Sequence, residues 1–183
     1  PTNVDILQAQ NLLNDLISFF EKENLGVNLD EFLVYKTHKD FLKSEADLSK
    51  IEKYLFDLNM QSKGLAYDRF IILGEHNFTK PVKMKQTRSF SIDPKLARMM
   101  SLDIPLIKNI HRRYKDSAYS RVIARIYELA YLMKHAKKLL SDISIDENSF
   151  NNPKSINEIT ASGIGIVEAP RGPLIHKVDI EKG

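Results

Sequence analysis

The sequence feature that most constrains the fold is a long amphipathic segment over residues 118–140. Its apolar residues recur every three or four positions, which places them on one face of an α-helix. That face is formed by Val122, Ile126, Leu129, Met133, Ala136 and Leu140. Ser117 can cap the start, while Lys137 and Lys138 stand near the C-terminal end, where cations offset the helix dipole. We therefore predict one domain built around this helix.

Two further capped helices are predicted before residue 65. Thr2 and Asp5 are three residues apart, the spacing of a capping box, and can start the first helix. Ser44 and Asp47 repeat that spacing at the start of the second helix. Glycines that can end these helices follow at Gly26 and Gly64. Residues 29–43, between the two helices, fit either a short helix or a strand.

Proline marks two more helix starts, at Pro94 and Pro105, each preceded within two residues by an aspartate. Proline is favoured at the first helical position, because its missing N–H would have no partner there. Residues 141–160 are polar and irregular, which predicts a surface loop. No internal repeat divides residues 1–183, so we expect a single domain.

Strand patterns occupy two regions. Residues 70–73 are a short apolar run, and alternating apolar and polar residues follow it. In the second region, glycines at 163, 165 and 172 punctuate a strand–turn–strand pattern. The sequence therefore predicts a mainly α protein with a minor β element (α+β), with short strands or a hairpin near 65–92 and 164–182. The pair Gly163 and Gly165 lacks the third glycine of a dinucleotide-binding loop, so we do not assign that function.

The cysteine and histidine content excludes several kinds of site. The chain has no cysteine, so it offers no disulfide, thiolate zinc site, thiol nucleophile or ligand for an iron–sulfur cluster. Its five histidines are scattered, and no two have the helical spacing of a metal-binding pair. We therefore predict no metal site within this chain.

The apolar runs and the charge balance bear on location and partners. No apolar run approaches the roughly 20 residues that a membrane helix needs, and the N-terminal segment does not resemble a signal peptide. We expect a cytoplasmic protein that does not interact with a membrane. Two basic stretches, at 80–88 and 108–115, could follow phosphates, but acidic residues balance the rest of the chain and the net charge is only +3. A solvated basic face, with no nucleic-acid partner, is the favoured interpretation.

The most unusual turn in the chain is Glu-Ala-Pro-Arg-Gly-Pro at residues 168–173. Pro170 fixes one backbone dihedral angle, and Gly172 allows conformations closed to other residues. Such a turn can hold the guanidinium group of Arg171 in a defined direction. A plain surface turn between two strands is the alternative interpretation.

Three segments resemble the large subunit of nickel–iron hydrogenases. Residues 165–172, Gly-Ile-Val-Glu-Ala-Pro-Arg-Gly, resemble the family's Glu-Ala-Pro-Arg-Gly segment. Residues 124–129, Ala-Arg-Ile-Tyr-Glu-Leu, resemble the core of its central helix, and Leu-Ala-Arg at 96–98 resembles the segment before that helix. The order and spacing match, and the resemblance covers residues 65–183. The closing sequence suits the cytoplasmic NAD- or deazaflavin-linked branch.

This resemblance implies a parent protein that oxidises dihydrogen reversibly at a nickel–iron centre and pairs with a small iron–sulfur subunit. In the family, the arginine of the Ala-Pro-Arg-Gly segment lies over the metals and bonds a cyanide ligand of iron. The resemblance gives that catalytic place to Arg171, with Ala169 and Pro170 lining the same pocket. An electrostatic role suits a guanidinium group, which stays charged and presents its donors in a fixed geometry.

The family holds its metals with four cysteines in two Cys-x-x-Cys pairs, and neither pair is present here. We expect either a segment from between those pairs of a longer large subunit, or a family member that has lost the metal site. In both cases this chain alone should bind no metal cofactor and be inactive. A segment separated from its parent is also expected to self-associate through exposed apolar surface. The competing hypothesis is a non-enzymatic helical binding module with a mildly basic contact surface.

Overall fold

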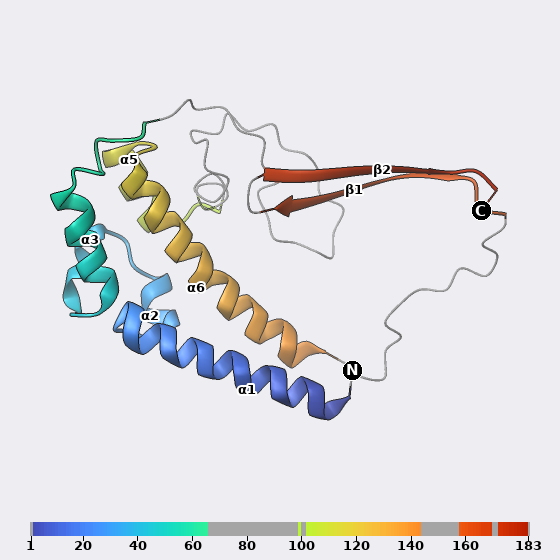
Figure 1. The fold of residues 1–183 in the computed structure, drawn as a ribbon, viewed down its shortest axis with the longest axis horizontal. Coiled ribbons are helices and arrows are strands. Elements are labelled where there is room, and N and C mark those ends of the chain that lie inside the picture. Colours follow the sequence, from blue (N-terminus) through green and yellow to red (C-terminus); the bar gives the residue numbers. More distant parts are fainter. Residues whose placement is uncertain (1, 66–98, 100–101, 144–157, 170–171, 183) are drawn as a thin grey trace.

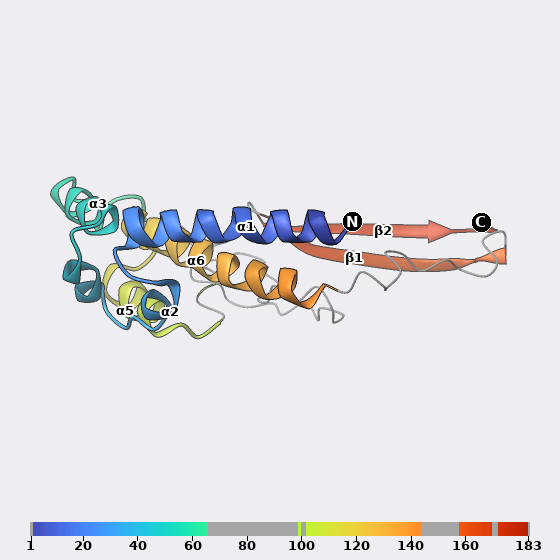
Figure 2. The same cartoon turned by 90° about the horizontal axis from the view of Figure 1, so that it is seen from below.

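The computed structural model describes residues 2–65, 99, 102–143, 158–169 and 172–182, which are mainly helical with one two-stranded antiparallel sheet. The predicted α+β class is therefore confirmed. Helices α1 (Asn3–Phe19) and α6 (Ala118–Asp142) lie side by side and run in opposite directions (Figures 1 and 2). The hairpin lies apart from the helices in Figure 1. Within the described ranges, no helix is long and apolar enough to cross a membrane.

The first helix begins as its capping residues predict. The backbone N–H of Asp5 donates to the Thr2 hydroxyl at 3.2 Å, and the Thr2 N–H donates to the Asp5 carboxylate at 2.7 Å. The helix then continues as a π-helix, η1 (Phe20–Leu25). Gly26 ends it with a left-handed φ of +71°, and its N–H donates to the Glu21 carbonyl at 2.7 Å.

The next segment is helical rather than extended. It contains α2 (Leu29–Leu33) and the 3-10 helix η2 (His38–Lys43). Helix α3 (Asp47–Asp57) follows, and its N-cap is Ala46 rather than the predicted Ser44. Ser44 lies two residues before this cap, and its hydroxyl donates to the Leu25 carbonyl at 3.1 Å. The helix also ends at Asp57, before the predicted stop at Gly64.

Helices α5 (Pro105–Tyr114) and α6 both begin as predicted. Pro105 occupies the first helical position of α5. The Ser117 hydroxyl accepts a hydrogen bond from the Ser120 N–H at 3.2 Å at the start of α6. The predicted surface loop is shorter at its start, because α6 extends to Asp142. Residues 144–157 of that loop lie outside the described residues, as does the helix predicted from Pro94 except for Met99, which is helical and buried.

The buried face of α6 matches the predicted apolar stripe in part: Met133 is buried, and Val122, Ile126, Ala136 and Leu140 are half-buried. Leu129 is 45% exposed, whereas the buried apolar residues are Tyr119, Ile123, Ala124, Tyr127, Ala130 and Met133. The tyrosines can be buried because each hydroxyl has a partner, which removes the main cost of burying it. The Tyr127 hydroxyl donates to the Leu33 carbonyl at 2.7 Å. The Phe32 ring packs beside Tyr127, with centroids 5.8 Å apart, in the core between α2 and α6.

The second predicted strand region forms a hairpin of β1 (Ala161–Ala169) and β2 (Gly172–Ile180). The strands pair in register from Ala161 with Ile180 to Ala169 with Gly172. Large apolar side chains of the hairpin are exposed, including Ile164, Leu174, Ile175 and Val178. The strands predicted near 65–92 lie outside the described residues, apart from Leu65 itself, which is not in a strand.

Candidate functional site

A pocket of about 680 Å³ lies beside η2 and α3. Its wall is formed by His38, Leu42, Ser44, Glu45, Ser49, Lys50, Glu52, Lys53 and Phe56. Apolar rings and an aliphatic side chain therefore share the pocket with two acids, two lysines and two hydroxyl groups. We take this pocket as the candidate site of the helical part, because its wall includes a buried carboxyl group.

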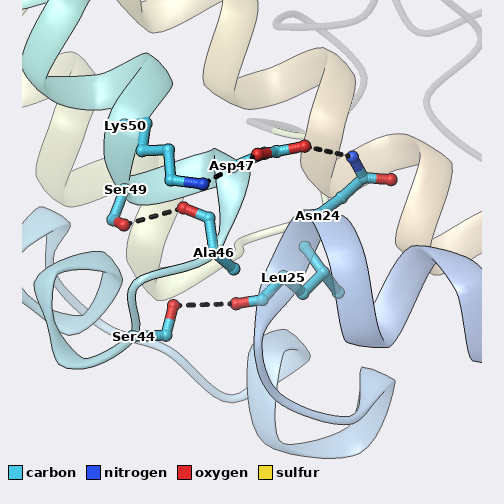
Figure 3. A network of polar contacts seen from close by, with 7 residues as sticks. All are labelled: Asn24, Leu25, Ser44, Ala46, Asp47, Ser49 and Lys50. Carbon is cyan, nitrogen blue, oxygen red and sulfur yellow. Dashed lines mark hydrogen bonds and ion pairs between the residues drawn. The ribbon is translucent and has the colours of Figure 1, made fainter.

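Polar contacts between η1 and the start of α3 hold one side of the pocket (Figure 3). The Asn24 amide donates to the Asp47 carboxylate at 3.5 Å, and the Ser44 hydroxyl donates to the Leu25 carbonyl. Gly26 permits this close approach, since a Cβ there would lie 2.6 Å from the Ser44 Cβ. The connection from η2 to α3 is thereby fixed against the end of the first helix.

The first turn of α3 supplies its own polar contacts (Figure 3). The Lys50 ammonium group lies 3.3 Å from the Asp47 carboxylate, and the Ser49 hydroxyl donates to the Ala46 carbonyl at 2.8 Å. The ammonium group of Lys50 is exposed, so this ion pair contributes little to stability. Its effect on the pocket is to offset the positive charge of Lys50 at the rim.

Glu52 is the most unusual residue of the wall, because it is 2% exposed. Its Oε1 accepts a hydrogen bond from the Tyr119 hydroxyl at 2.9 Å, while Oε2 has no hydrogen-bond partner in the described part of the chain. Burial raises the pKa of the Glu52 carboxyl above its ordinary value of 4.5, and the Tyr119 hydrogen bond offsets this only in part. Burial, followed by the charge of Glu52, raises the pKa of Tyr119, so that its hydroxyl stays a donor.

An aromatic cluster surrounds this pair. The ring of Phe56 lies edge-on to Tyr119, with centroids 5.0 Å apart, and Tyr114 contacts both rings. His38 stacks on Phe56 at 6.2 Å, and burial is the first cause that lowers its pKa, with the nearby Arg113 charge second. A less basic His38 is mostly neutral at pH 7, so its ring acts as a further flat wall.

The arrangement can bind but does not form a catalytic constellation. No nucleophile lies hydrogen-bonded to a base at the pocket wall, since the Ser44 and Ser49 hydroxyls both donate to backbone carbonyls. Across the described residues, no three histidine, aspartate or glutamate side chains gather in a way that could hold a metal ion.

The residues predicted from the sequence stand elsewhere, at the tip of the hairpin. Ala169 is the last residue of β1 and pairs with Gly172, the first residue of β2. Pro170 and Arg171, which join the two strands, lie outside the described residues. The hairpin thus agrees with a turn at this place, whereas the direction of the Arg171 side chain and its catalytic role stay predictions.

The sequence contained a signal for the Glu52 pocket that the motif search did not use. Glu52 follows Leu48 by four positions, so both lie on the same face of α3. Leu48 is 3% exposed, which means that this shared face is the buried one. A charged residue on the buried face of an amphipathic helix is the kind of exception that points to a site.

Comparison with known proteins gives one relevant similarity. Over 98 residues the chain is 30% identical to the protein named sulfhydrogenase 2 subunit alpha of Pyrococcus furiosus. The aligned part covers 51% of this chain and 21% of the relative, so the chain spans about a fifth of the relative's length. No family model matches the chain, and no solved structure matches it. The similarity links this chain to a hydrogenase alpha subunit.

Proposed function

We propose that the chain is the central segment of the large subunit of a nickel–iron hydrogenase that oxidises dihydrogen reversibly. The observation that carries this proposal is the similarity to the sulfhydrogenase alpha subunit. The Glu-Ala-Pro-Arg-Gly segment supports it, and Ala169 at the end of β1 pairs with Gly172 at the start of β2. We further propose the cytoplasmic NAD- or deazaflavin-linked branch, and a small iron–sulfur subunit as partner.

The residues of this chain do not fit a nickel–iron centre by themselves. The chain has no cysteine and therefore supplies no thiolate ligand. Nor do the described histidines and carboxylates gather as a ligand set. Thiolate ligands would have to come from other parts of the parent. In the family, two Cys-x-x-Cys pairs supply them.

The contribution we propose for this chain is a fixed positive charge, on Arg171. A guanidinium group has a pKa above about 12, so it acts as a charge and hydrogen-bond donor rather than as a base. Its planar fork can orient an anionic group in a water-excluded site. In this proposal Ala169 and Pro170 line the same pocket and hold the turn that carries Arg171.

Arg171→Lys in the full-length parent tests this role, because it keeps the charge and loses the planar fork. We expect dihydrogen oxidation with a viologen dye to fall about a hundredfold, with an unchanged melting temperature. Lys177→Arg is the matched control: Lys177 is an exposed residue of β2 beside Asp179, and its replacement should leave turnover normal. Near-normal turnover in Arg171→Lys with a large loss of stability would make Arg171 a structural residue.

The family assignment is tested separately, by elemental analysis of the purified parent with its partner subunits. Nickel and iron in fixed ratio to protein are expected. A parent with neither nickel nor dihydrogen turnover would contradict the assignment. It would favour the helical binding module, in which exposed basic residues of α5 such as Lys108, Arg112 and Arg113 form the contact surface.

A further inference from the structure

The pocket beside η2 and α3 has the size and the walls of a small-molecule site. Its volume of about 680 Å³ falls within the range of roughly 300–1,000 Å³ typical of such sites. Leu42, Phe56 and the imidazole ring of His38 supply the apolar contact, and His38 and Phe56 stack nearly parallel, at 25°. A flat apolar body of one or two rings suits walls of this kind.

Glu52 gives the pocket a polar requirement that the described residues leave unmet. Its Oε2 has no hydrogen-bond partner, and less than 1 Å² of that atom is accessible to water. An unpartnered buried oxygen is costly, so any group that could reach it would gain free energy. Glu52 belongs to the pocket wall, so a ligand bound in the pocket lies beside this carboxyl group.

The Tyr119 hydrogen bond decides what kind of group Glu52 needs. Because Tyr119 donates to Oε1, a proton carried by the carboxyl group sits on Oε2, which then needs an acceptor. In the ionised form Oε2 needs a donor instead. A hydroxyl group can both donate and accept, so it satisfies Glu52 in either state.

The charges at the rim favour an uncharged ligand. Lys50 and Lys53 are both exposed residues of the wall, Glu45 is an exposed acid of the same wall, and Asp47 lies next to it at the start of α3. Lys50 is also paired with Asp47. The two lysines and two acids leave no net charge that would select an anion or a cation.

We propose that this pocket binds a small, uncharged aromatic alcohol, with its ring against His38, Leu42 and Phe56 and its hydroxyl group on Glu52. The site is separate from the hairpin and does not depend on the hydrogenase assignment. It adds a ligand-binding function to the helical part of the chain.

Titration calorimetry of the full-length protein with 2-naphthol and with naphthalene tests the proposal. Naphthalene keeps the rings but can neither donate nor accept a hydrogen bond, so it cannot satisfy Glu52 in either state. We expect one saturable site for 2-naphthol and binding of naphthalene that is about tenfold weaker. Equal affinities would overturn the role of Glu52, and the absence of saturable 2-naphthol binding would overturn the site itself.

Two variants locate the binding. Glu52→Leu should abolish the preference for 2-naphthol over naphthalene. Leu42→Asp alters an exposed wall residue, 61% exposed, and should weaken both ligands about tenfold by placing a charge against the ring. Leu12→Asp, the same change at a residue of α1 that is 71% exposed and outside the pocket wall, is the control. If Glu52→Leu does not fold, the comparison of the two ligands on the wild type and the Leu42→Asp variant still test the proposal. Unchanged binding in Leu42→Asp would contradict the site.

Discussion

Burial and charge conflict directly at Glu52. The residue is 2% exposed, yet within the described part of the chain its carboxyl group has one hydrogen bond, from Tyr119, to offset that burial. Burial disfavours the charged carboxylate and raises its pKa, so the folded protein holds the Glu52 proton more tightly than the unfolded chain does. Between the unfolded pKa near 4.5 and the higher folded pKa, this group makes the free energy of unfolding fall as pH rises.

Glu52→Gln should remove that pH dependence, because the amide has the same shape but does not ionise. Its oxygen can still accept the Tyr119 hydrogen bond. We expect the variant to gain stability relative to the wild type as pH rises above 4.5. Urea unfolding from pH 4.5 to 8 measures the difference between the two curves. Glu45→Gln, an exposed acid of the same pocket, is the control and should follow the wild type; a constant difference for Glu52→Gln would contradict the argument.

At Gly26, the absence of a Cβ atom matters for stability. A side chain there would meet both a left-handed φ of +71° and the Cβ atoms of Ser44 and Ala46, at 2.6 and 2.9 Å. Gly26→Ala should therefore lower the free energy of unfolding by about 1–3 kcal/mol. Gly163→Ala on β1, where a Cβ would have no neighbour within 4 Å, should change it by about 0.5 kcal/mol or less. Equal effects in urea unfolding would mean that the close packing at Gly26 is not stabilising.

At the scale of single elements, α6 depends on its cap. Ser117 is fully buried, and its hydroxyl accepts from the Ser120 N–H. Ser117→Ala leaves that N–H without its partner and should cost about 1 kcal/mol. Ser141→Ala, at an exposed serine near the other end of the helix, should cost clearly less. The two melting temperatures test this, and a similar loss in both variants would contradict the importance of the cap.

The hairpin differs from the helices in how little of its apolar surface is covered by other elements. An isolated two-stranded hairpin is marginally stable in water and gains stability when a further strand or a helix covers it. On β2, the side chains of Leu174, Ile175 and Val178 are about half exposed. We therefore expect the hairpin that carries the proposed catalytic turn to need packing against other segments for its stability.

At the scale of the whole molecule, the helical part also leaves apolar surface uncovered. On α1, Leu12, Leu16 and Phe19 are 71%, 50% and 60% exposed, and they lie at helical spacing on one side. Contiguous apolar surface of this kind drives association. The expected self-association of the separated chain would then involve α1.

Light scattering over a concentration series tests this with the double variant Leu12→Lys and Leu16→Lys. We expect the wild-type chain to grow in apparent mass with concentration and the double variant to do so markedly less. Gln8→Lys adds charge to an exposed position of the same helix without removing apolar surface, so it should still associate. A strictly monomeric wild type, or equal association of all three proteins, would contradict a role for α1.

The sequence by itself determined the elements whose signals are local. The Thr2 and Ser117 caps, the proline at the start of α5 and the glycine-punctuated hairpin each depend on residues within a few positions of one another. The lack of cysteine likewise follows from the sequence alone and limits what this chain can ligate. Arg171, the residue proposed for catalysis, rests on resemblance and stays a prediction.

Only the tertiary structure decided which faces are buried and where the pocket lies. Ser44 fits a helix cap by spacing, but α3 begins with Ala46 as its N-cap, and the Ser44 hydroxyl donates to the Leu25 carbonyl, 19 positions away. Glu52 is buried because Tyr119, 67 positions away, supplies a donor, and that tyrosine belongs to a face of α6 that the apolar pattern did not select. Hydrophobic periodicity records side-chain polarity along one helix, whereas burial depends on partners from distant segments, so the pattern alone could not identify this face or this pocket.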